Sequence, residues 1–327
     1  MRRRDFIALA GGVAAWPLAA RAQQGNRERH IGVFMNLPEG DPDATHWIAA
    51  LLKSLDEFGW TEGRNLRLDI RWGVDPARVQ KNAEELVALN PDVIVAASPP
   101  AVLALKQITR TVPIVFVAVT DPVALGLVES LARPGGNATG FSPSEVELSA
   151  KWVQALKEMV PALTRVAVFQ NPVNLGGAPQ FAAVQTAAAS LGVALSAIDV
   201  RDKSAIEQAV ASFANQPNGG LLTLRISENV ALRDSLVALA AKYRLPAVYP
   251  LRVFATGGGL ASYGPDIGEE YREAAGYVDR ILRGEKPANL PVQVASKFQL
   301  VINLKTAKSL GLAIPQTLLA TADEVLE

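Results

Sequence analysis

The sequence predicts an α/β protein made of two doubly wound parallel-sheet lobes. From residue 30 onward, short apolar runs alternate with amphipathic stretches of about ten to fifteen residues, the pattern of βαβ units. The chain of 327 residues is longer than a domain with a single hydrophobic core usually is, which predicts about two domains. The pattern also recurs, since "IGVFMN" at 31–36 is matched by "VAVFQN" at 166–171.

The first half should contain four strands separated by helices. We expect the strands at 30–35, 66–71, 92–97 and 114–119 and the helices near 43–58, 76–89 and 100–110. The following segment, "ARPGGNATGFSPSE" at 132–145, is rich in turn residues and has no periodicity. It therefore indicates the boundary between the lobes.

The second half repeats this order. We expect strands at 164–172, 192–200, 219–227 and 245–250, with helices near 178–191, 203–215 and 229–243. The tail then adds a strand at 258–264, a long helix ending near 286, and a strand that turns into a helix at 297–311.

The lengths of the two halves suggest how the tail is shared. If the whole tail extended the second lobe, that lobe would be far longer than the first. We therefore assign 30–143 plus 256–286 to lobe one and 144–255 plus 287–327 to lobe two, joined by a three-strand hinge.

Residues 1–22 have the pattern of a cleaved export signal. An arginine cluster precedes an apolar run of about 15 residues, and Ala20-Arg21-Ala22 fits a small-x-small cleavage site. The run contains Pro17 and is shorter than the ~20 residues of a membrane anchor, the alternative explanation. The segment Arg3–Ile7 resembles the twin-arginine pattern, with a Sec signal as the alternative.

Composition excludes several functions. Cleavage after Ala22 leaves 28 basic and 31 acidic residues, which disfavours nucleic acid as a partner. The absence of cysteine excludes disulfides, thiolate zinc sites and cysteine nucleophiles, and two histidines make a metal site a poor hypothesis. No G-x-S-x-G, P-loop or G-x-G-x-x-G signature follows the expected strands. We predict no catalytic residue, no metal and no cofactor.

Six loops carry the candidate binding residues. In open parallel sheets, ligands bind at the carboxyl ends of strands where the strand order switches. For a 2-1-3-4-5 strand order, the relevant loops follow the first, third and fourth strands of each lobe. These loops are 35–41, 97–101 and 119–122 in lobe one and 170–174, 225–229 and 248–252 in lobe two. The predicted ligand-binding residues are Asn36, Ser98, Pro99, Ala101, Thr120, Asp121, Asn171, Asn174, Arg225, Glu228, Tyr249 and Tyr263.

Two orientations of a ligand remain open. Asp121 could accept from an ammonium group while Arg225 holds a carboxylate through two parallel hydrogen bonds. Alternatively, Ser98 and Thr120 at helix starts take the carboxylate and Glu228 takes the ammonium. For Ser98 and Asp121, an ordinary helix cap is the competing explanation.

Four separated stretches carry a family likeness. "IVFVAVTDPVALGLVESLARPGGNATG", "LVALAAKYRLPAVYP", "GGLASYGPDIGEEYREAAGYVDRILRGEKPANLPVQ" and "KFQLVINLKTAKSLGLAIPQTLLATADEVLE", together with the export segment, resemble ABC-type substrate-binding proteins of the tryptophan/tyrosine-uptake-like family. The resemblance implies the type I periplasmic-binding-protein fold, a periplasmic location and an ABC permease partner in the inner membrane. It also implies a small-molecule solute. We expect this solute to be an amino acid or related small carboxylate, and the protein to be monomeric. The loops "NPVNLGGAPQ" and "LRISENVALRD" depart from the family pattern, in which an acid and aromatic residues often follow the strand.

The leading hypothesis is therefore a solute receptor of an importer, whose two lobes close on the ligand. A first alternative keeps the receptor and makes its partner a membrane sensor. A second is a periplasmic enzyme that uses Asp121 and Glu228 as an acid/base pair. The export signal and the absence of an appended helix-turn-helix disfavour a DNA-binding regulator.

Overall fold

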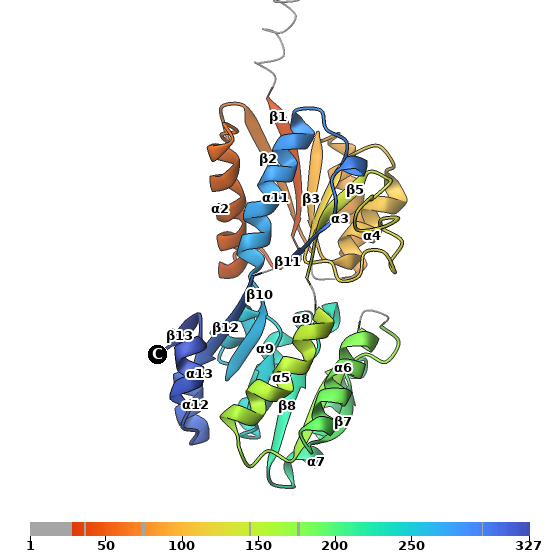
Figure 1. Cartoon of the computed structure of the whole chain (residues 1–327). Helices are drawn as coiled ribbons and strands as arrows, with labels where there is room; N and C mark the ends of the chain where they lie inside the picture. The colour runs from red at the N-terminus through yellow and green to blue at the C-terminus, as the bar shows by residue number, and fades with distance from the viewer. Residues whose placement is uncertain (1–27, 36, 74–75, 144, 175–176, 296) are drawn as a thin grey trace, which may run out of the picture.

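The chain folds into two α/β lobes placed end to end (Figure 1). The computed structural model describes residues 28–35, 37–73, 76–143, 145–174, 177–295 and 297–327. Each lobe is a mainly parallel sheet with helices on its faces, which confirms the predicted fold class. The predicted export signal lies outside the described residues. Within the described part of the chain, no helix has both the length and the apolar character required to span a membrane.

The sheet of lobe one has six parallel strands in the order β11-β5-β4-β3-β1-β2. The strands are β1 (Arg29–Met35), β2 (Leu66–Trp72), β3 (Val93–Ala97), β4 (Ile114–Val117), β5 (Ala138–Pro143) and β11 (Gln293–Ala295). The first five strands follow the predicted 2-1-3-4-5 order, so the strand order switches between β1 and β3.

Helices cover both faces of this sheet. The helices α2 (Pro42–Glu57) and α11 (Ile267–Leu282) pack side by side on one face (Figure 1). The other face is covered by α3 (Pro76–Ala88) and α4 (Pro99–Ile108). These helices bury the strand residues that point to this face, such as Phe34 of β1 and Ile94 of β3. Because both faces are covered, the central strands β1, β3 and β4 are apolar along most of their length, as in other parallel sheets.

The sheet of lobe two has seven strands in the order β13-β12-β10-β9-β8-β6-β7. They are β6 (Arg165–Gln170), β7 (Ala194–Asp199), β8 (Gly219–Thr223), β9 (Ala247–Tyr249), β10 (Ala261–Pro265), β12 (Phe298–Asn303) and β13 (Glu324–Leu326). Strands β10 and β12 are antiparallel, and every other pair is parallel. The strands β7-β6-β8-β9-β10 again follow the 2-1-3-4-5 order.

The helices of lobe two lie between these strands in the chain. They are α5 (Glu145–Met159), α6 (Gly177–Ser190), α7 (Lys203–Ala214), α8 (Ser227–Ala231), α9 (Arg233–Lys242), α10 (Arg252–Thr256), α12 (Leu304–Leu310) and α13 (Gln316–Thr321). A short 3-10 turn, η1 (Pro287–Asn289), precedes β11. The helices α5 and α6 pack side by side (Figure 1).

The passage expected to be an irregular boundary contains a buried strand instead. Strand β5 pairs with β4, and its residue Gly140 has φ +154°. A Cβ at Gly140 would lie 2.0 Å from the carbonyl oxygen of Phe116, so only glycine permits this close approach. Gly140 is one of the turn residues that made this segment look irregular, and the packing of β5 against β4 requires it.

The tail is shared differently from the expected boundaries. The chain crosses between the lobes after β5, after β10 and after β11, which are three crossings. Strand β10, expected in lobe one, pairs with β9 and β12 of lobe two, whereas β11, expected in lobe two, pairs with β5 of lobe one. Strand β10 fills the place between β9 and β12, and β11 covers the free edge of β5; both are tertiary requirements that local periodicity does not report.

Candidate functional site

A cavity of about 380 Å³ lies between the two lobes. Described residues from five of the six predicted loops line it; those of 35–41 do not. Trp47 of α2 and Ile267 of α11, from the two helices on one face of lobe one, also line it. The cavity therefore lies where the carboxyl ends of both sheets face each other, the position expected for a ligand of this fold class.

The lobe-one side of the cavity is formed by the start of α4 and the turn after β4. Ser98 precedes the helix with φ 80° and ψ 150°, and its side chain makes no capping hydrogen bond. Pro99 and Pro100 follow and line the cavity with it, as does Thr120. A hydroxyl group at a helix N-terminus favours an anion, because the helix dipole is positive there.

Arg225 joins the two lobes inside the cavity. The residue follows β8 of lobe two, yet its Nη2 donates to the carbonyl oxygen of Ala118 in lobe one at 3.0 Å. Its Nη1 lies 3.4 Å from Oγ1 of Thr120. Gln180, fully buried in α6, fixes the backbone of Arg225 through hydrogen bonds at 2.9 and 3.2 Å.

The buried carboxyl group of Glu270 lies behind this contact. The residue lies in α11, is 2% exposed, and its Oε2 accepts from the backbone N–H of Ala118 at 2.7 Å. Burial raises the pKa of Glu270 to about 7, although the positive charge of Arg225 opposes the rise. Burial also lowers the pKa of Arg225 to about 10, so the guanidinium stays charged at neutral pH. The peptide of Ala118 thus contacts a group from each lobe: its carbonyl oxygen accepts from Arg225 of lobe two, and its N–H donates to Glu270 of lobe one.

The lobe-two side of the cavity carries a positioned carboxylate. Oε1 of Glu228 accepts from Nδ2 of Asn171 at 2.7 Å, and Oε2 accepts from Nδ2 of Asn174 at 3.1 Å. The two asparagines follow β6, whereas Glu228 lies in α8, so three side chains from two loops are fixed together. A half-buried carboxylate with its orientation fixed is suited to an ammonium group.

The rest of the lining is mostly apolar. Trp47 stacks on Tyr271, with ring centroids 5.9 Å apart, and lines the cavity. The other leucine, isoleucine and valine residues of the lining are Leu103, Leu125, Val173, Ile226, Val230, Leu251 and Ile267. The cavity therefore offers polar groups at two places and apolar surface between them.

Seven of the twelve predicted binding residues line this cavity. They are Ser98, Pro99, Thr120, Asn171, Asn174, Arg225 and Glu228. Asp121 is exposed and caps the following turn, where its Oδ1 accepts from the N–H of Ala124 at 3.0 Å. Its φ of 45° turns the chain away after Thr120.

The other predicted residues lie elsewhere. Tyr249 is fully buried and stacks on Phe254 with centroids 5.0 Å apart, and burial raises its pKa. Tyr263 lies in β10, with the ammonium of Lys151 5.8 Å from its ring centroid. Ala101 is buried within α4 and is not part of the lining. Asn36 lies outside the described residues.

Sequence reasoning missed the apolar lining and Glu270. Trp47 packs by stacking on Tyr271, and it also lines the cavity. A Glu between two otherwise apolar positions of an amphipathic helix was the only available signal for Glu270. Among the described residues, no group of three or more possible metal ligands occurs.

Comparison with known proteins places the chain among transport proteins. The sequence model of the family described as "ABC transporter substrate binding protein" matches residues 40–326. A tyrosine-binding protein of Clostridioides difficile (strain R20291) is 25% identical over 290 residues, which cover 88% of this chain and 82% of that protein.

Solved structures show the same arrangement of lobes. A conserved domain protein from Vibrio cholerae O1 biovar El Tor has a TM-score of 0.82 and 30% identity, covering 91% of this chain and 100% of that one. An ABC domain from Streptococcus pneumonia in complex with L-Trp has a TM-score of 0.82 and 24% identity over the same shares. Among more distant neighbours is an arabinose-binding protein from Geobacillus stearothermophilus, with a TM-score of 0.59 and 12% identity.

Proposed function

The chain belongs to the ABC transporter substrate-binding protein family, and on this premise we propose that it is the receptor of an importer for an amino acid with an apolar side chain. Members of this family bind a substrate and are not enzymes, which agrees with the absence of a predicted catalytic residue. The relatives described as tyrosine-binding and as a complex with L-Trp support the amino-acid class.

The observation that carries the proposal is the polarity of the cavity. Ser98, Thr120 and the start of α4 make one end suited to an anion, and the charge of Arg225 adds to it. Glu228 makes the other polar position suited to a cation. A zwitterionic amino acid matches both, and the apolar lining matches an apolar side chain.

This polarity favours one of the two orientations. The ligand carboxylate lies against Ser98 and Thr120, and the ligand ammonium lies against Glu228. In the other orientation Asp121 would receive the ammonium, but its carboxylate is exposed and caps a turn outside the cavity lining.

The partners follow from the same premise. We propose that the mature protein acts as a monomer in the periplasm and delivers its ligand to an inner-membrane permease. Contacts between the lobes, such as that of Arg225 with Ala118, would form as the lobes close on the ligand.

A thermal-unfolding panel tests the proposal. Residues 23–327, freed of carried-over ligand by unfolding and refolding, are mixed with L-leucine, L-phenylalanine and L-tryptophan. Two matched analogues of tryptophan are included: tryptamine, which lacks the carboxylate, and indole-3-propionate, which lacks the ammonium group. A ligand at 100 times its dissociation constant adds about 2.7 kcal/mol, which raises Tm by roughly 4 °C in a chain of this size.

The proposal predicts a shift with at least one intact amino acid and none with either analogue at the same concentration. A panel in which no amino acid raises Tm would refute the proposed ligand class. Consumption of the bound compound would instead support the enzyme hypothesis.

A further inference from the structure

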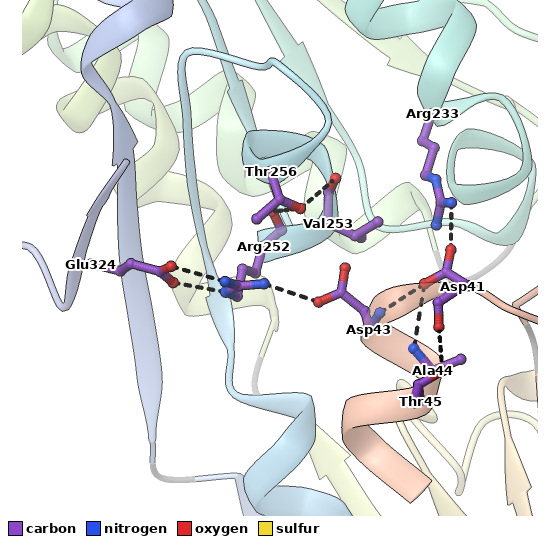
Figure 2. Close-up of polar contacts among 9 residues, drawn as sticks. All are labelled: Asp41, Asp43, Ala44, Thr45, Arg233, Arg252, Val253, Thr256 and Glu324. Carbon is purple, nitrogen blue, oxygen red and sulfur yellow. Dashed lines mark hydrogen bonds and ion pairs between the residues drawn. The ribbon is translucent and has the colours of Figure 1, made fainter. Parts of the chain in front are cut away.

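Two ion pairs connect the lobes outside the ligand cavity (Figure 2). Asp41 and Asp43 belong to lobe one, at the start of α2, and Arg233 and Arg252 belong to lobe two. Oδ2 of Asp41 lies 2.5 Å from Nη2 of Arg233, and Oδ1 of Asp43 lies 3.0 Å from Nη1 of Arg252. We call these four residues the latch.

The two carboxylate oxygens of Asp41 accept hydrogen bonds from different lobes. Its Oδ1 caps α2 by accepting from the N–H groups of Asp43 and Ala44 at 2.9 and 3.3 Å. Its Oδ2 is left for Arg233 (Figure 2). Because the cap already fixes the carboxylate, little side-chain entropy is lost when Arg233 docks on it.

Arg233 occupies a position that its own helix does not favour. It is the first residue of α9, where the helix dipole disfavours a positive charge. Its side chain is 18% exposed and that of Asp41 is 3% exposed, so the pair is largely removed from water. Its contact within lobe two, to the exposed Asp234, is longer at 3.3 Å. The ion pair with Asp41 of lobe one, and not an interaction within α9, therefore accounts for an arginine at position 233.

Arg252 is oriented by its own lobe before it reaches the other. Glu324 of β13 accepts two hydrogen bonds from it, at 2.7 and 2.8 Å. Nη1 remains for Asp43, a residue whose pKa burial raises against the opposing charge of Arg252. If the lobes separated, Arg252 would keep Glu324, whereas Asp43 would regain water.

The latch lies directly behind one wall of the ligand cavity. Trp47, Leu251 and Ile267 line both the ligand cavity and the crevice that contains the latch. Trp47 follows Asp43 by one turn of α2, and Leu251 immediately precedes Arg252. Docking the ion pairs therefore brings these apolar side chains of opposite lobes together at the edge of the cavity.

We propose that Asp41, Asp43, Arg233 and Arg252 are positioning residues that hold the lobes closed without touching the ligand, and so set how long the ligand stays bound. The inference rests on the proposed binding of a small molecule in the cavity. The latch also biases the ligand-free protein toward closure.

Variants of Arg233 test the proposal with L-tryptophan as the probe. The dissociation rate of L-tryptophan, followed by stopped-flow fluorescence, should rise about tenfold in Arg233→Ala and further in Arg233→Glu, which repels Asp41. Tenfold corresponds to about 1.4 kcal/mol. Arg233→Lys keeps the charge and should restore most of the wild-type rate. The Tm of the free protein should change little, because Arg233 supports neither lobe alone.

Arg280→Ala is the matched control. It breaks an arginine–glutamate pair with two 2.7 Å hydrogen bonds, to Glu285, that lies within lobe one. It should leave the dissociation rate unchanged.

Small-angle scattering of the ligand-free protein supplies an arm that needs no ligand. The radius of gyration should increase in Arg233→Glu and in Arg233→Ala with Arg252→Ala, and should match wild type in Arg233→Lys and Arg280→Ala. If L-tryptophan does not bind, the scattering arm still decides whether the latch exists, so the two proposals fail separately. Unchanged scattering in the Arg233→Glu variant, or an unchanged dissociation rate where L-tryptophan binds, would overturn the latch.

Discussion

Replacing Glu270 by glutamine should remove a pH dependence of folding stability that the buried carboxyl group creates. Burial raises the pKa of Glu270 from 4.5 to about 7, against the opposing charge of Arg225 and the hydrogen bond from Ala118. Glutamine keeps an oxygen for that N–H and cannot titrate.

The sign of the effect follows from proton binding. Below pH 4.5 the carboxyl group is protonated in the folded and the unfolded chain, and its stabilising contribution is fully present. Between pH 4.5 and about 7 the folded protein keeps a proton that the unfolded chain releases, so the free energy of unfolding falls as pH rises. One proton limits the slope to about 1.4 kcal/mol per pH unit, and the whole loss to roughly 3 kcal/mol. In a chain of this size that loss is about 5 °C in Tm.

The assay is thermal unfolding at half-unit steps from pH 4 to 8.5, for wild type and three variants. Wild type should lose stability from pH 5 to 7 relative to Glu270→Gln, whose absolute stability can be lower because Arg225 loses its countercharge. Arg225→Met removes the charge that opposes the rise in the pKa of Glu270, so the loss of stability should begin at the same pH and extend to higher pH. Glu158→Gln, at an exposed position of α5, is the control and should match wild type. Parallel curves for wild type and Glu270→Gln would refute the reasoning.

Three further substitutions separate binding from folding. Glu228→Gln removes the charge opposite the ligand ammonium and should weaken amino-acid affinity by about ten- to a hundredfold, with Tm of the free protein within 2 °C, measured by calorimetric titration. Asp121→Ala should lower the free energy of unfolding by about 1 kcal/mol through the lost cap and leave affinity within twofold; a large loss of affinity would return Asp121 to the site. Gly140→Ala places a methyl group 2.0 Å from the carbonyl oxygen of Phe116 and should lower Tm by more than 10 °C or prevent folding, and a well-folded variant would show that β5 can move away from β4.

Much of the fold could be predicted because the two sheets are built from local patterns. Buried parallel strands such as β1, β3 and β6 are continuous apolar runs, and α2 and α11 carry a strong amphipathic period. Strand β5 and strand β11 escaped prediction, since one is masked by turn residues and the other has three residues. Short edge strands depend on an available sheet edge, which only the folded lobe provides.

The candidate site could be predicted in part for the same reason. The rule that ligands bind beyond the carboxyl ends of strands located Ser98, Thr120 and Glu228, because their position follows from strand order alone. The ion pair of Asp41 with Arg233 joins residues 192 positions apart, and no local pattern links them. Asp121 shows the opposite limit, since a polar residue after a buried strand has the same local signature whether it faces a ligand or caps a turn.

The three crossings of the chain determine when each lobe can become complete during synthesis. The sheet of lobe one includes β11 at residues 293–295, and α2 is covered by α11 at 267–282. A nascent chain that has emerged only as far as β9 still exposes the side of α2 that contacts α11, including Trp47. The lobe that begins first is therefore finished almost last, and its contacts close loops of more than 200 residues. Slow, late folding is the expected consequence, and a fragment ending before residue 267 should be insoluble without a chaperone.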